Sequence, residues 1–199
     1  MMFMSGFTDA FSEATDDQEN WEYQISALPS GLENITSWAE DNTSAFELTL
    51  VAQATIAGTT KAIDLKGNDV LSEQDDALHR MNLLEGNLPV SGQSPTQGIL
   101  DEGSSELESY AIGDVITIDF EGEQHDIEVV GIARELSRSI YMHRSDVQPI
   151  VGEEANGALL VTTPGADIED IRFSTMKIVE KETMVATFEE LIEQQKAVM

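Results

Sequence analysis

The chain has 199 residues and 41% hydrophobic side chains, enough to build the core of one large domain or of two small ones. Its 38 acidic and 10 basic residues give a net charge of −28, which argues against a nucleic-acid partner and suits a cationic partner, a high-salt habitat or a soluble outward-facing surface. Because the chain contains no cysteine, it has no disulfide, no zinc-thiolate site and no thiol nucleophile.

The N-terminal third predicts an α+β unit, because apolar residues recur at helical spacing in some segments and alternate in others. We expect a helix, a strand, a second helix and two further strands, in this order: Phe3–Ala14, Trp21–Leu28, Leu32–Ala39, Phe46–Ala57 and Lys61–Leu65. Ser72–Met81 is then predicted to be a helix with Ser72 as its N-cap. Asn87–Gly98, rich in Pro, Gly, Ser and Gln, is predicted to be a loop.

A β-hairpin is the clearest prediction in the middle of the chain. Val115–Phe120 alternates and is rich in β-branched residues, which predicts a strand. Glu121–Glu123 supplies the turn, with Gly122 free to adopt a positive φ, and Ile127–Ile132 resumes as the second strand. A short helix at Ser104–Tyr110 leads into the hairpin, whose apolar face must pack on another element.

The C-terminal part repeats the strand and helix pattern of the N-terminal part. We expect a buried strand, a short helix, a short strand or extended segment and a final helix: Ala158–Thr163, Asp167–Ser174, Met176–Glu182 and Thr187–Val198. Thr187 followed three residues later by Glu190 predicts a capping box at the start of the final helix.

Several of these segments, taken together, resemble the extracytoplasmic domain of ABC-transporter permeases of the MacB/FtsX family. The segments that carry the resemblance are IDLKGND (63–69), LLEGNLPVSGQSPTQGILDEG (83–103), the short helix, IGD (112–114), the hairpin ending in VVGI (129–132) and IYMHRSDV (140–147). The match lies in their pattern and order. It covers Ile63 to Val161 and extends loosely into the flanks.

The resemblance implies an α+β fold of two lobes. Residues 1–67 and 156–199 would form a membrane-proximal, porter-like lobe of strand–helix–strand units, and residues 68–155 an inserted, β-rich, sabre-like lobe. It places the domain at the cell membrane, on its extracellular or periplasmic side, between two membrane helices. Under this interpretation Met1–Met4 is the last turn of the first membrane helix, and the helix from Thr187 runs toward the second.

The resemblance also implies a function without catalysis and without a cofactor. Such a domain couples cytoplasmic ATP hydrolysis to substrate export or to activation of a partner. The implied partners are a cytoplasmic ATP-binding subunit, reached through the membrane helices, a second permease copy or sister subunit, and an extracytoplasmic adaptor or substrate. A free-standing exported acidic binding or adhesion module is the alternative, and a hydrolase of an unrecognised fold is a third possibility.

The residues themselves show no catalytic constellation. The three histidines lie in separate segments, so no HExxH zinc pattern exists, and neither the G-x-S-x-G nucleophile motif nor the phosphate-binding G-x-x-x-x-G-K-[ST] motif occurs. Carboxylates are so abundant that chance alone produces pairs. Tyr141-Met142-His143 contains residue types that ligate haem iron, but one such run is weak evidence for a haem site.

One basic patch stands out on this acidic chain. It follows the hairpin and comprises Arg134, Arg138, His143 and Arg144, and Tyr141 joins them as a candidate partner contact. Its arginines either neutralise carboxylates nearby, as surface ion pairs commonly do, or form a contact face for a partner or an acidic ligand group.

Overall fold

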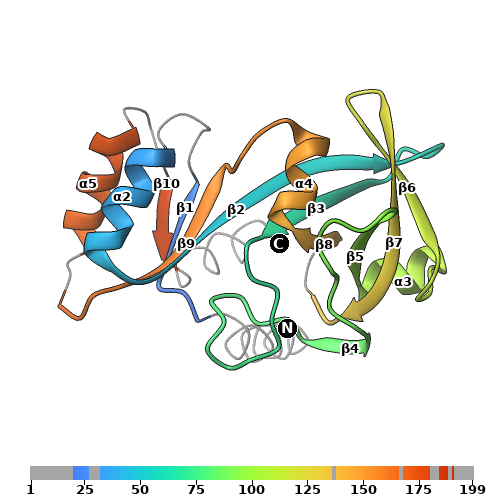
Figure 1. Ribbon diagram of the computed structural model, residues 1–199, viewed down its shortest axis with the longest axis horizontal. Helices are drawn as coiled ribbons and strands as arrows, with labels where there is room; N and C mark the ends of the chain where they lie inside the picture. The colour runs from blue at the N-terminus through green and yellow to red at the C-terminus, as the bar shows by residue number, and fades with distance from the viewer. Residues whose placement is uncertain are drawn as a thin grey trace, which may run out of the picture. The chain divides into compact units, whose positions relative to one another are not determined.

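The chain divides into two compact units, called unit 1 and unit 2 below. One long strand, β2 (Thr43–Ile56), begins in unit 1 and continues into unit 2. The structure is a computed structural model that describes residues 20–26, 32–135, 138–165, 168–179, 184–187 and 190 (Figure 1). Unit 1 comprises Met1–Glu47, Gln74–Arg80 and Gly157–Met199, and unit 2 comprises Leu48–Glu73 and Met81–Asn156. The predicted helix Phe3–Ala14 lies outside the described residues.

Unit 1 is a small sheet with two helices. Its strands lie in the order β10 (Met184–Thr187), β1 (Tyr23–Ser26) and β9 (Gly157–Thr162), and both neighbouring pairs are antiparallel. The helices α2 (Leu32–Asn42) and α5 (Ile168–Val179) contact each other. The core of unit 1 includes buried apolar residues from both helices and two strands: Ile25, Ile35, Ala39, Leu160 and Ile171.

A second cluster of unit 1 joins the sheet to the segment Gln74–Arg80. Trp21, Leu78 and Leu159 pack together there, with Ala45 and Val161 at the margin. The prediction of a helix at Ser72–Met81 is wrong, because residues 74–78 form turns and bends and Ser72, His79 and Arg80 are bridge residues. Its backbone groups bond to distant residues instead of forming a helix.

Unit 2 is built on a closed β-barrel. Among the described residues, six strands pair in a ring in the order β2, β3 (Ala62–Asn68), β8 (Ser139–His143), β5 (Thr96–Asp101), β7 (Glu123–Ala133) and β6 (Val115–Phe120), and β6 returns to β2. The pairs β3–β8 and β5–β7 are parallel, and the other pairs of the ring are antiparallel. β4 (Leu83–Gly86) pairs with β7 outside the ring.

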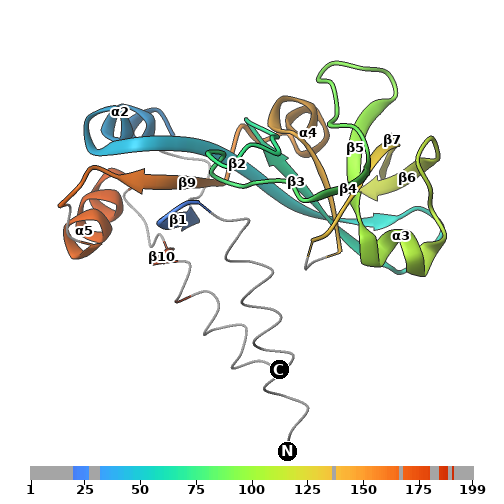
Figure 2. The same cartoon turned by 90° about the horizontal axis from the view of Figure 1, so that it is seen from below.

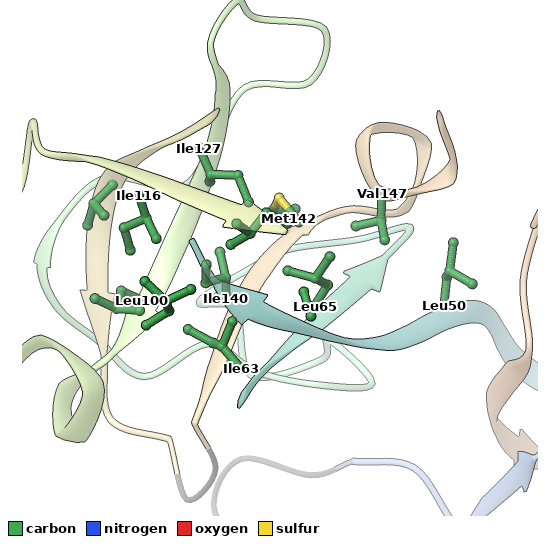
Figure 3. Packing of buried hydrophobic residues seen from close by; sticks show 13 residues of the cluster. Leu50, Ile63, Leu65, Leu100, Ile116, Ile127, Ile140, Met142 and Val147 are labelled. Atoms are coloured by element: carbon green, nitrogen blue, oxygen red, sulfur yellow. The ribbon is translucent and has the colours of Figure 1, made fainter. Parts of the chain in front are cut away.

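Apolar side chains fill the barrel (Figure 3). The strands place alternate residues inward, so the interior cluster draws on every strand of the ring and includes Leu50, Ile63, Leu65, Leu100, Ile116, Ile127, Ile140 and Met142. Gly98 of β5 has no side chain, and its neighbours fill the space where one would lie: a Cβ there would lie 2.5 Å from Cγ2 of Ile140. The interior is therefore a packed core and not a ligand cavity.

Two short helices complete unit 2 and lie well apart on the barrel (Figure 2). α3 (Glu102–Glu108) is capped by buried Asp101, whose Oδ1 accepts from Ser104 N at 2.9 Å and whose Oδ2 accepts from Ser139 N at 3.0 Å. α4 (Arg144–Val151) packs against β3 at Gly67 and adds the buried Val147 to the interior cluster.

The structure agrees with the predicted hairpin and differs from the prediction elsewhere. β6 and β7 form the hairpin, and the turn has positive φ at Glu121 (53°) and Gly122 (89°). β4, β5, β8 and α4 were not predicted, and Met176–Val179, predicted as extended, lies in α5. Residues 48–67, predicted with the first lobe, lie in unit 2 because the second half of β2 forms the barrel.

Candidate functional site

The strands β1 and β10 place the chain's entry into unit 1 next to its exit. They pair antiparallel, with Tyr23 opposite Thr187 at one end and Ser26 opposite Met184 at the other. Because the chain enters β1 at Tyr23 and leaves β10 at Thr187, both connections are at the same end of the strand pair.

A polar network fixes the exit from β10. Glu190 Oε2 accepts from Thr187 N at 2.9 Å, and Thr187 Oγ1 accepts from Glu190 N at 3.1 Å, which confirms the predicted capping box. Arg172 of α5 donates through Nη2 to both carboxylate oxygens of Glu190, at 2.6 Å each. This hydrogen-bonded guanidinium, helped by the Thr187 bonds, lowers the pKa of Glu190, and the same contact raises the pKa of Arg172.

The three arginines of the predicted basic patch each bond to an acidic neighbour. Arg134 Nε lies 3.5 Å from Glu102. Arg138 Nη2 donates to Glu108 at 2.9 Å. Arg144 Nε donates to Asp69 at 2.7 Å and its Nη1 to the Glu154 carbonyl at 2.6 Å, so all three neutralise or satisfy groups nearby.

The two other residues of the predicted patch are held by polar bonds inside unit 2. Tyr141 is buried, with its hydroxyl accepting from Lys66 Nζ at 2.9 Å and donating to Glu135 at 2.9 Å. His143 Nε2 lies 3.1 Å from the Pro89 carbonyl oxygen. The contact face that these five residues were predicted to form stays a prediction.

The run Tyr141-Met142-His143 does not converge on one point. Met142 lies in the barrel interior, whereas its neighbour Tyr141 packs in a different cluster with Leu71 and Met81. Successive residues of a strand point to opposite faces, so Tyr141 and Met142 cannot ligate the same iron from one side. Over the described part of the chain, His, Asp and Glu residues form no group that could hold a metal ion.

Glu108 carries a second ion-pair centre, which the sequence did not reveal. It accepts from Lys61 Nζ at 2.5 Å and from Arg138 Nη2 at 2.9 Å. The hydrogen bond from Lys61, and then the positive charges of Lys61 and Arg138, lower the pKa of Glu108. Its partners are distant in sequence, so no spacing motif could have identified the cluster.

The comparisons with known structures identify the fold. The periplasmic region of MacB from Actinobacillus actinomycetemcomitans superimposes with a TM-score of 0.59 at 13% identity, covering 94% of this chain and 97% of that one. The extracellular domain of the noncanonic ABC-type transporter YknZ from Gram-positive bacteria gives a TM-score of 0.54 at 14% identity, covering 83% of this chain and 98% of that one. The chain has the MacB-type extracytoplasmic fold. No family model matches the sequence, and no curated protein sequence matches it significantly.

The MacB-type fold confirms the resemblance drawn from the hairpin and its flanking segments, and with it the α+β class. Both neighbours are matched over nearly their whole length. Among the helices that the structure describes, none has the length and apolar character that a membrane crossing requires.

Proposed function

We propose that this chain is the extracytoplasmic domain of an ABC-transporter permease subunit. In this role it couples ATP hydrolysis on the cytoplasmic side to export of a substrate or to activation of a partner, and it performs no catalysis itself. The observation that carries the proposal is the MacB-type fold, together with the entry and exit of unit 1 at one end of the β1–β10 pair. A domain held between two membrane helices needs its two connections close together.

The architecture supports a mechanical role. Unit 2 is a closed barrel with a filled interior, and packed cores transmit displacement because they deform little. In this proposal unit 1 is the membrane-proximal, porter-like lobe and unit 2 is the inserted, sabre-like lobe. The partners are a cytoplasmic ATP-binding subunit, a second permease copy or sister subunit, and an extracytoplasmic adaptor or substrate.

The charge of the domain supports an outward location and constrains the partner. A net charge of −28 over the whole chain keeps the domain soluble and repels anionic lipid headgroups. A partner that binds this surface needs positive charge at the contact. Of the predicted patch residues, Arg134 has the most exposed side chain, at 57%, and is the first to test as a partner contact.

Labelling in intact cells tests the proposal. The domain has no cysteine, so Val90→Cys, at a position 57% exposed, introduces a single reactive thiol, and Ala133→Cys, at a buried position, is the matched control. We expect a membrane-impermeant maleimide to label Val90→Cys in intact cells and not Ala133→Cys. We also expect the labelled protein to stay with the membranes through an alkaline wash.

Each other outcome of this labelling experiment identifies a different protein. Labelled protein that is released into the medium or by the wash supports the free-standing exported module and contradicts the permease. Protein that is labelled only after the cells are opened contradicts both. Labelling of Ala133→Cys at the rate of Val90→Cys would show that the domain is not folded as described.

A further inference from the structure

Two runs of exposed residues lie side by side on unit 2. One comprises residues 84–87, which begin in β4, and the other comprises residues 111–115, which end at the first residue of β6. Ile112 brings them together, because its Cδ1 would lie 2.8 Å from a Cβ added at Gly86. The two runs therefore form one surface of unit 2, called the β4–β6 patch below.

Three aliphatic side chains of the β4–β6 patch are exposed. Leu84 is 41% exposed, Ile112 38% and Val115 47%. Single exposed aliphatic side chains are ordinary on a protein surface, whereas several of them in one place are typical of an interaction surface. Gly86, two residues after Leu84 and beside Ile112, has no side chain that would cover them.

The backbone under the β4–β6 patch is bonded to β7. Gly113 N donates to the Val129 carbonyl at 2.8 Å, and Val129 N donates to the Asp114 carbonyl at 2.8 Å. Asn87 N donates to the Val130 carbonyl at 2.9 Å. A surface that is held in place before binding loses less conformational entropy when it binds, so this patch is prepared to receive a partner.

Carboxylates surround the aliphatic side chains of the patch. Glu85 follows Leu84, and Asp114 precedes Val115. Glu128 lies opposite Val115 in the β6–β7 pair. Neither run contains a lysine or an arginine. A partner with aliphatic side chains next to positive charge would match both features of the patch.

The charge of the chain disfavours two other occupants. A second copy carries the same net charge of −28 and would bring like charges together at the patch. Anionic lipid headgroups are repelled for the same reason. Arg134, which lies near the start of β4, is paired with Glu102 and therefore does not reverse the charge at the patch.

We propose that the β4–β6 patch docks a segment of an extracytoplasmic protein that presents aliphatic side chains flanked by lysine or arginine. The inference rests on the proposed permease function, because that function places the patch outside the cytoplasm. It names the chemistry by which the adaptor or substrate protein is recognised and the surface that it contacts.

Fluorescence anisotropy with the purified 199-residue chain tests the docking. The probe is a labelled heptapeptide in which three central leucines lie between two pairs of lysines. In one control peptide serines replace the leucines, and in the other glutamates replace the lysines. At about 0.15 M salt we expect the probe to bind roughly tenfold more tightly than either control peptide, since attraction by charge alone would not distinguish leucine from serine.

Two patch variants and one matched control locate the binding site. Val115→Ser and Ile112→Ser each remove an aliphatic side chain from the patch. The control is Val51→Ser, because Val51 is also a strand valine of unit 2, is 41% exposed and lies in the β2–β3 pair. We expect each patch variant to weaken binding of the probe about fivefold or more and Val51→Ser to leave it unchanged. A thermal melt of each variant shows that the chain is folded.

The outcomes separate the inference from the function on which it rests. If both patch variants bind the probe as tightly as the parent, or if the probe binds no better than the serine peptide, the docking inference is overturned and the permease function stands. A dimer of the parent chain that Val115→Ser dissociates in sedimentation would also overturn it, because a second copy would then occupy the patch. If the probe binds as expected but the maleimide labels Val90→Cys only in opened cells, the permease function and the extracytoplasmic partner are both wrong.

Discussion

Substitution of Gly98 by alanine tests whether the barrel is closed and filled. Gly98 lies in β5, and the side chains around it belong to β8 and β7, the two strands that flank β5 in the barrel. An added Cβ would lie 2.5 Å from Ile140 Cγ2, 3.0 Å from Ile127 Cγ2 and 3.3 Å from Met142 Cγ. Carbon atoms in favourable contact are ~3.5–4.0 Å apart, so Ile140 must move by about 1 Å.

The surroundings leave Ile140 little room to move. It is buried, and its strand pairs on both sides, with Leu65 and Leu100 as its neighbours. Overpacking of a core costs about 1–3 kcal/mol, and replacing glycine by alanine returns about 0.4–1 kcal/mol by restricting the unfolded chain. We therefore expect Gly98→Ala to lower the free energy of unfolding by about 1–2 kcal/mol.

Urea denaturation of the purified 199-residue chain measures the effect. With a slope of about 2 kcal/mol per molar urea, the middle of the usual range, the midpoint should fall by roughly 0.5–1 M. Gly103→Ala, in the first turn of α3, is the control: its Cβ would lie 3.2 Å from Asp101 Oδ1, a milder contact, so the midpoint should fall by less than in Gly98→Ala. Ile140→Ala combined with Gly98→Ala should cost less than the sum of the two. A Gly98→Ala chain as stable as the parent would refute the filled barrel.

Three further predictions concern the exit network and the charge. Thr187→Ala removes the hydroxyl that accepts a hydrogen bond from Glu190 N, and it should lower the free energy of unfolding in urea by about 1 kcal/mol. Thr187→Ser keeps the hydroxyl and should lower the free energy of unfolding little. Equal losses in the two variants would contradict the capping role of Thr187. The pKa values of Glu108 and Glu190 are lowered in the folded state, so their ion pairs stabilise the folded protein at pH values above 4.5, the ordinary pKa of a glutamate. This stabilisation is lost as the pH falls through the lowered pKa values of the folded state. As the pH falls, the parent should therefore lose more unfolding free energy than Glu108→Gln, or gain less from the relief of charge repulsion; an identical pH dependence in that variant would count against the assignment. Molar KCl should raise the melting temperature, because it shortens the screening length to ~3 Å and weakens repulsion among the charges that sum to −28. A melting temperature indifferent to salt would show that the acidity does not strain the fold.

Local patterns in the sequence sufficed to predict the hairpin and the capping box. β6 and β7 are adjacent in sequence, alternate strictly and meet at a turn with a glycine, so neighbouring residues determine their pairing. Thr187 and Glu190 are likewise three residues apart. Elements of this kind can be predicted from neighbouring residues alone, and the hairpin was one of the segments that carried the resemblance to the MacB/FtsX permeases.

The barrel could not be predicted because its closure is non-local. β5 is short, contains Gly98 and pairs in parallel with β7, and β3 pairs in parallel with β8, so both β5 and β8 are stabilised by distant strands. α4 spans eight residues and contains Pro149, which obscures its helical pattern. Ser72–Met81 fits a helical pattern, but distant partners, among them Asn20, bond to this segment in other conformations.

The candidate site shows the same division. The sequence identified the arginines of the basic patch but not their partners, and the structure pairs them with Glu102, Glu108 and Asp69. Asn20 and Arg172 carried no signal, because an exposed asparagine and a helical arginine are ordinary residues until their partners are known. The partners of these residues are far apart from them in sequence, so they could be identified only from the three-dimensional structure.

The central claim is that ATP on the far side of the membrane moves this domain. A distance measurement between two copies in the assembled permease tests it most directly, with a spin label on Leu107→Cys of α3, an exposed and helical position. We predict that the distribution of distances between the two labels shifts when ATP is added to the nucleotide-free transporter. Identical distributions with and without ATP, in a transporter that hydrolyses ATP, would contradict it.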